Sequence, residues 1–185
     1  MPRYVALLRG INVGKNNRIS MADLRNLIEG LGHADVRTHL NRGNVVFTAS
    51  EQPNETLATD IQTAITSTLD LDVPVIVRTG QEMRDVVANN PFPEHAANHT
   101  TLHVTFLGAT PDPNLVAALA DAPRGDDNYR PIGSEIYLHY PNKISGAIFM
   151  PNGLDRALNM STTSRNWRTV SALAEMATDS QGPTQ

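Results

Sequence analysis

The sequence predicts an α+β protein of two tandem ferredoxin-like (split βαβ) halves, each an antiparallel sheet with helices on one face. Three observations predict it: strand and helix patterns alternate as β-α-β-β-α-β up to residue 78, a proline-rich segment follows at residues 90–95, and the same element order then begins again. The predicted parts are 1–79 for the first half, 80–100 for a helix and connector, 101–178 for the second half and 179–185 for a disordered tail.

The first strand, helix and hairpin have distinct patterns. Residues 4–8 form an apolar run without alternation, which is typical of a central strand buried on both faces. Ser20 and Asp23 form a capping-box pattern, so a helix begins there and continues to Gly32. Alternating residues 36–40 then lead through a tight turn at residues 41–44 into a second apolar strand, which predicts a hairpin.

A second helix and an edge strand complete the first half. Apolar residues repeat at helical spacing from Asn54 to Leu69. The β-branched run of residues 73–77 contains Pro74, which cannot donate a ladder hydrogen bond, so this strand is expected at an edge.

The second half is predicted to have the order β-α-β-β-α. A capping-box pair, Thr79 and Glu82, first opens a short helix ahead of the connector. A strand follows at residues 102–107, and Asp112 caps a helix that begins at a proline. Two strands flank the Gly133-Ser134 turn, and a final helix is expected from Ser164 to Ala177.

Composition excludes several classes of protein. The chain has 185 residues and a net charge of −4, which disfavours non-specific binding of nucleic acid through bulk charge. No apolar run is long enough to span a bilayer and no secretory signal pattern opens the chain, so we expect a cytoplasmic protein without membrane contact. The absence of cysteine excludes disulfides and thiolate catalysis, and no cofactor is expected. Oligomeric state is left open.

The segment after the first strand is a candidate anion site. It combines glycines, which free backbone N–H groups, with fixed positive charge; the candidate ligand-binding residues are Arg9, Asn12, Gly14 and Lys15. The glycine spacing and the residue after Lys15 do not match a nucleotide-triphosphatase phosphate loop. The competing interpretation is a long connection whose glycines only accommodate positive φ.

Two further segments carry similar residue types. The hairpin tip contributes Asn44 as a candidate and adds the charge of Arg42, although the residues of such a tip can simply supply turn angles. The expected start of the last helix contributes Arg165, Asn166 and Arg168 as candidates. Two arginines in a first helical turn oppose the helix dipole, so either a carboxylate or a bound anion is expected beside them.

The opening stretch Tyr4–Asn17, the hairpin tip Asn41–Asn44 and the segment Thr163–Thr169 resemble those of the domain-of-unknown-function 1697 family of bacterial proteins, over nearly the whole chain. The resemblance implies a fold and no particular reaction. Members of that family more usually have serine before the glycine of the hairpin tip, so Arg42 is a departure.

The leading hypothesis is therefore a protein that binds a small anionic ligand, phosphorylated or nucleotide-like, in a cleft lined by the three segments. An enzyme acting on a phosphorylated substrate is the alternative, but it needs a base from outside these segments; the candidates are Asp155, Glu135, His39 and His139. A nucleic-acid or protein interaction module is a further alternative, which the low aromatic content disfavours. His95, His99 and His103 recur every four residues, but the prolines before them disfavour one helix through all three, and no metal site is assigned.

Overall fold

The computed structural model describes residues 1–14, 17–123, 125–142, 149 and 152–178. The chain forms two compact units, one of Met1–Val87 together with the chain from Ser171 onward, and one of Ala88–Val170. The boundary after Val87 falls inside the predicted connector. The predicted tail, 179–185, lies outside the described residues.

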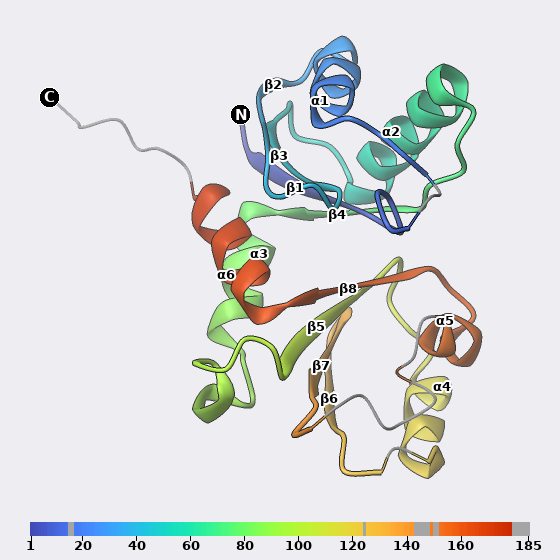
Figure 1. Cartoon of the computed structure of the whole chain (residues 1–185), viewed down its shortest axis with the longest axis vertical. Coiled ribbons are helices and arrows are strands. Elements are labelled where there is room, and N and C mark those ends of the chain that lie inside the picture. The colour runs from blue at the N-terminus through green and yellow to red at the C-terminus, as the bar shows by residue number, and fades with distance from the viewer. Residues whose placement is uncertain (15–16, 124, 143–148, 150–151, 179–185) are drawn as a thin grey trace, which may run out of the picture. The chain divides into compact units, whose positions relative to one another are not determined.

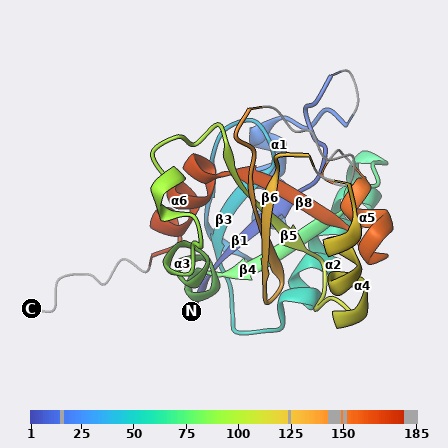
Figure 2. The ribbon, with the colours of Figure 1, turned by 90° about the horizontal axis from the view of Figure 1, so that it is seen from below.

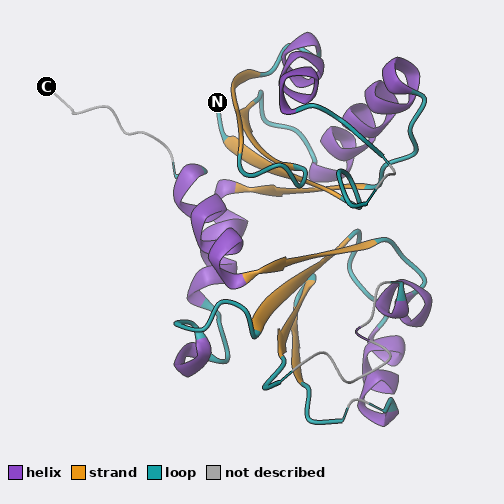
Figure 3. Cartoon of the chain, viewed as in Figure 1, coloured by secondary structure: helices purple, strands orange, loops and turns teal. Residues whose placement is uncertain are grey.

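A four-stranded antiparallel sheet forms the first unit (Figures 1 and 3). Its strands are β1 (Arg3–Leu8), β2 (Ala34–Thr38), β3 (Asn44–Thr48) and β4 (Val75–Thr79), in the order β2-β3-β1-β4. Strand β1 is central, as its unbroken apolar run predicted. Strand β4 is at an edge, as Pro74 just before it predicted.

Two helices, α1 (Met21–Gly30) and α2 (Asn54–Leu69), cover one face of this sheet (Figure 1). The core between them and the sheet includes Tyr4, Ala6 and Leu8 from β1 and Ile28 and Ile61 from the helices. The capping box that was expected before α1 is confirmed: the Ser20 Oγ accepts from the Asp23 N–H at 3.0 Å.

The first unit also contains α3 (Gly80–Ala88) and the end of α6 (Trp167–Met176). A reciprocal capping box opens α3, because Glu82 N donates to Thr79 Oγ1 at 3.1 Å and Thr79 N donates to Glu82 Oε2 at 2.6 Å. A β-carbon on Gly80 would lie 2.5 Å from the Ala177 carbonyl oxygen. Only glycine therefore fits where the start of α3 passes the end of α6.

The second unit has a sheet with the same strand order. Its strands are β5 (Leu102–Leu107), β6 (Asn128–Ile132), β7 (Glu135–His139) and β8 (Thr162–Asn166), all antiparallel, in the order β6-β7-β5-β8. The predicted turn joins β6 and β7, with Gly133 at φ +60°. The short helices α4 (Pro113–Ala118) and α5 (Gly153–Leu158) lie side by side against one face (Figures 1 and 2).

The core of the second unit lies on that face and includes Leu107, Ile136, Leu138 and Leu154. A 3-10 helix, η2 (Leu119–Asp121), extends α4, and another, η1 (Pro93–His95), lies in the proline-rich segment.

The prediction for the end of the chain is wrong in two respects. Residues 162–166 form strand β8, and the last helix begins at Trp167 rather than Ser164. Strand β8 is polar and pairs only with β5, so it lacks the apolar alternation of a buried strand. The Asn166 Oδ1 accepts from the Thr169 N–H at 2.9 Å and so caps α6. The prediction also missed α5.

Candidate functional site

The segment between β1 and α1 is closed by one asparagine side chain. Asn12 has φ +54°, and its Nδ2 donates to the Ile19 carbonyl oxygen at 2.8 Å while its Oδ1 accepts from the Ile19 N–H at 3.0 Å. Its backbone N–H also donates to the Asn17 carbonyl oxygen. These hydrogen bonds join Asn12, on one side of the loop, to Asn17 and Ile19 on the other side.

The same side chain joins this loop to the β2–β3 turn. Asn12 Nδ2 also donates to the Asn41 carbonyl oxygen at 3.1 Å. Close by, the Leu8 N–H donates to the Gly43 carbonyl oxygen at 2.8 Å. A β-carbon on Gly43 would lie only 2.7 Å from the Leu8 β-carbon. Two of the three predicted segments are thus in contact, and we call the joined residues, 9–14 and 17–18 with 39–44, the loop–turn surface.

The loop–turn surface includes three arginines, Arg9, Arg18 and Arg42. Arg9 is half-buried, and burial lowers the pKa of its guanidinium. The backbone N–H of Arg9 donates to the Pro74 carbonyl oxygen at 2.9 Å. Arg18 is exposed, and its Nη2 donates to the Gly14 carbonyl oxygen at 3.1 Å. Arg42 is exposed at the turn. The Lys15 candidate lies outside the described residues.

Asn44 is placed differently from the other candidates. Its side chain is 1% exposed, and its Nδ2 donates to the His39 carbonyl oxygen at 2.9 Å. It therefore shapes the turn from the inside, as Asn12 shapes the loop. Ligand contact by either asparagine stays a prediction.

The third predicted segment belongs to the second unit. Arg165 lies on β8 rather than in a helix, and its Nη1 donates to Thr163 Oγ1 at 2.7 Å and to the Ser164 carbonyl oxygen at 2.8 Å. Asn166 caps α6, and Arg168 is exposed in the first turn of that helix. Two arginines were expected to oppose the dipole of the last helix, but only Arg168 lies in that helix.

The candidate bases are engaged in different parts of the fold. Asp155 Oδ1 accepts from both the N–H and the hydroxyl of Thr162, which ties α5 to β8. His39 lies in the β2–β3 turn, where its N–H donates to the Asn44 carbonyl oxygen. Glu135 opens β7.

His139 and His95 stack on one another in the second unit. Their ring centroids are 3.6 Å apart and their planes differ by 6°. Burial, and next the neighbouring His95, lowers the pKa of His139, while Glu94 and Asp127 act in the opposite direction. Among the described residues, the His139 Nδ1 has no hydrogen-bond partner. No group of three or more metal-ligating side chains is found in the described part of the chain.

The family model of proteins of unknown function DUF1697 matches residues 1–137, about three quarters of the chain. The chain belongs to the DUF1697 family. The match spans the whole loop–turn surface. No curated protein matches the sequence.

A solved structure shares the fold of this DUF1697 protein. It is that of the conserved bacterial protein SP0830 from Streptococcus pneumoniae, with a TM-score of 0.74 and 22% sequence identity. The alignment covers 95% of this chain and 98% of that one. Among the described residues of the DUF1697 protein, no helix is long and apolar enough to cross a bilayer.

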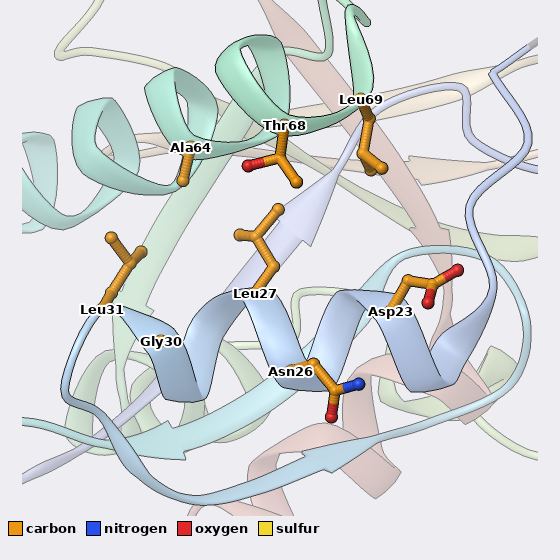
Figure 4. A pocket seen from close by; sticks show the side chains of 8 residues that line it. All are labelled: Asp23, Asn26, Leu27, Gly30, Leu31, Ala64, Thr68 and Leu69. Carbon is orange, nitrogen blue, oxygen red and sulfur yellow. The ribbon is translucent and has the colours of Figure 1, made fainter.

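The first unit also has a groove between α1 and α2, which the sequence did not predict (Figure 4). It has a volume of about 450 Å³, and its lining includes Leu27, Leu31 and Leu69 with Asp23 at the start of α1. No lysine or arginine lines it. The small residues Gly30 and Ala64 were the available sequence signal, and the groove is unsuited to an anion.

Two apolar residues of the loop–turn surface were also missed. Val13 is 59% exposed and Leu40 is 58% exposed. Each is an apolar residue within a polar loop or turn, which was the only sequence signal. Arg18 ends the predicted loop but was not among the expected binding residues, because it lies beyond the glycine-lysine pair Gly14-Lys15.

Proposed function

We propose that this DUF1697 protein binds a small anionic ligand, phosphorylated or nucleotide-like, at the loop–turn surface. The observation that carries the proposal is the hydrogen bond from Asn12 to Asn41, which brings two arginine-bearing segments into one surface. Arg18 and Arg42 offer charge-assisted donors to the ligand, and Arg9 adds positive charge at the base of the loop.

The distribution of charge supports this choice. The net charge of the chain is −4, yet residues 1–22 and residues 36–50 contain no acidic residue. Residues 43–77, in contrast, contain five acidic residues and neither lysine nor arginine. Local positive potential in an otherwise acidic protein attracts anions to one place.

Isothermal titration calorimetry tests the proposal, with inorganic phosphate and a panel of nucleotides and sugar phosphates. We expect at least one compound to bind the wild type and to bind an Arg18→Ala, Arg42→Ala double variant at least about tenfold more weakly, since each hydrogen bond to a charged group is worth about 1.5–3 kcal/mol. An Arg37→Ala, Arg84→Ala double variant is the control, because it removes the same charge from elsewhere in the unit. The proposal is wrong if nothing binds, or if both variants weaken binding equally.

The participation of Arg165, Asn166 and Arg168 in the same site stays a prediction. It is tested separately with an Arg165→Ala, Arg168→Ala variant. Weaker binding of the same compound supports a shared site, and unchanged affinity limits the ligand to the loop–turn surface.

We also propose that both units are of the ferredoxin-like class. The orders β2-β3-β1-β4 and β6-β7-β5-β8 support this, because in each sheet a helix-linked pair of strands is separated by the third strand. A crystal structure with parallel neighbouring strands in either sheet would contradict it.

A further inference from the structure

The loop–turn surface combines arginines with exposed apolar side chains. Four large apolar residues are exposed in the described part of the chain, and two of them, Val13 and Leu40, are on this surface. The other two are Met1 and Leu31. A single exposed apolar residue is ordinary. What matters here is that Val13 and Leu40 lie on two segments that are joined to each other.

Val13 and Leu40 are far apart in the sequence, but a hydrogen bond joins the segments that carry them. Val13 follows Asn12, Leu40 precedes Asn41, and Asn12 Nδ2 donates to the Asn41 carbonyl oxygen. The two apolar residues thus each lie one position from an end of the same hydrogen bond. Because the Asn12 side chain also makes two hydrogen bonds to the backbone of Ile19, on the other side of its loop, the position of Asn12 is fixed.

Arginine charge borders this apolar pair on both segments. Arg18 is tied to Gly14, the residue after Val13, and Arg42 lies two positions beyond Leu40. A simple inorganic anion makes no use of two exposed aliphatic side chains, which gain free energy only when apolar surface covers them. A molecule with an anionic group and an apolar part satisfies both.

Resting on the proposed function, we propose that the ligand of the loop–turn surface is an amphiphilic anion: a phosphate or carboxylate that carries an alkyl or other apolar group. The arginines hold the anionic group, and Val13 and Leu40 contact the apolar part. Such a ligand has two sources, a soluble metabolite or an anionic lipid at a membrane surface, and both present this chemistry.

Calorimetry with alkyl phosphates from methyl to hexyl tests the soluble source. For the wild type we expect affinity to rise about twofold for each added methylene, below the roughly fourfold limit for complete burial. A Val13→Ser, Leu40→Ser double variant should bind methyl phosphate as the wild type does and lose the rise. Leu31→Ser is the matched control, since Leu31 is exposed in the α1–α2 groove, and it should keep the rise.

Sedimentation with phosphatidylcholine vesicles, with and without phosphatidylserine, tests the lipid source. Binding that needs phosphatidylserine and is lost in the double variant supports the proposal and assigns the anion to a lipid surface. A chain-length rise with soluble phosphates and no vesicle binding supports it with a soluble ligand.

The proposal is overturned if affinity is constant along the alkyl series and vesicles do not bind, or if the double variant keeps the rise. Constant affinity with retained phosphate binding leaves the proposed function intact. Absence of binding by every phosphate, methyl phosphate and vesicles included, overturns the proposed function itself.

Discussion

Replacing Gly43 by alanine tests how tightly the β2–β3 turn packs against β1. Gly43 has φ +72°, a left-handed conformation that costs an alanine about 1–2 kcal/mol. The new β-carbon would lie 2.7 Å from the Leu8 β-carbon and 3.0 Å from the Ile11 Cγ1. Leu8 and Ile11 are both buried, so neither can move away freely. Overpacking of this kind costs about 1–3 kcal/mol.

Gly10→Ala separates the two contributions. Gly10 has φ +67°, but a β-carbon there would have nothing within 4 Å. Both substitutions reduce the entropy of the unfolded chain equally and both impose left-handed strain, so these effects cancel in the comparison. The difference between the two variants measures the packing alone, and we expect Gly43→Ala to be the less stable by about 1–3 kcal/mol.

Urea unfolding followed by far-ultraviolet circular dichroism measures both variants, with hydrogen exchange of β1 and β3 amides to assign the loss to the first unit. Exchange should accelerate more in Gly43→Ala than in Gly10→Ala. Equal stability of the two variants would refute the reasoning, because it would show that the turn does not pack against Leu8 and Ile11 in solution.

Three further outcomes are expected. Asn12→Ala should lower the free energy of unfolding by about 2–4 kcal/mol, from three side-chain hydrogen bonds and a left-handed φ, and it should open the loop to proteolysis; an uncut loop would contradict this. Gly80→Ala should destabilise the end of α6 by about 1–3 kcal/mol, seen as faster amide exchange there, and normal exchange would show that α3 and α6 do not approach closely. Because the pKa of His139 is lowered in the folded state, the unfolded chain binds this proton more readily, so the second unit should be fully stable above about pH 6.5 and lose stability as the pH falls toward the lowered value. His139→Phe should reduce that loss in urea titrations read by Trp167 fluorescence, with His103 causing the rest because burial lowers its pKa too; an identical pH profile in this variant would assign the loss to other groups.

The sequence predicts the first unit well because its signals are local and agree with one another. The capping boxes at Ser20 and Thr79 are read directly from spacing, and Pro74 marks the edge strand. Strand β8 was mistaken for the start of a helix because its residues are polar and its identity depends on pairing with β5, which is distant in sequence.

The sequence predicts which segments carry the residues of the proposed site but not how those residues are held. Glycines, asparagines and arginines marked the loop and the turn, and these two segments are joined. Residue composition does not reveal that Asn12 and Asn44 direct their amides at backbone carbonyls, because that depends on three-dimensional contacts. The exposure of Val13 and Leu40 likewise depends on what the fold leaves uncovered.

The path of the chain has a consequence for biosynthesis. The first unit is made of Met1–Val87 and the chain from Ser171 onward, and Arg3 Nη1 donates to the Met176 carbonyl oxygen at 2.8 Å. A ribosome adds about 5–20 residues each second, and Arg3 and Met176 are 173 residues apart, so this contact can form only about 9–35 s after Arg3 is synthesised. During translation the first unit is therefore incomplete until the chain from Ser171 onward has been made. A stop codon shortly before Ser171 would remove part of the unit that is synthesised first.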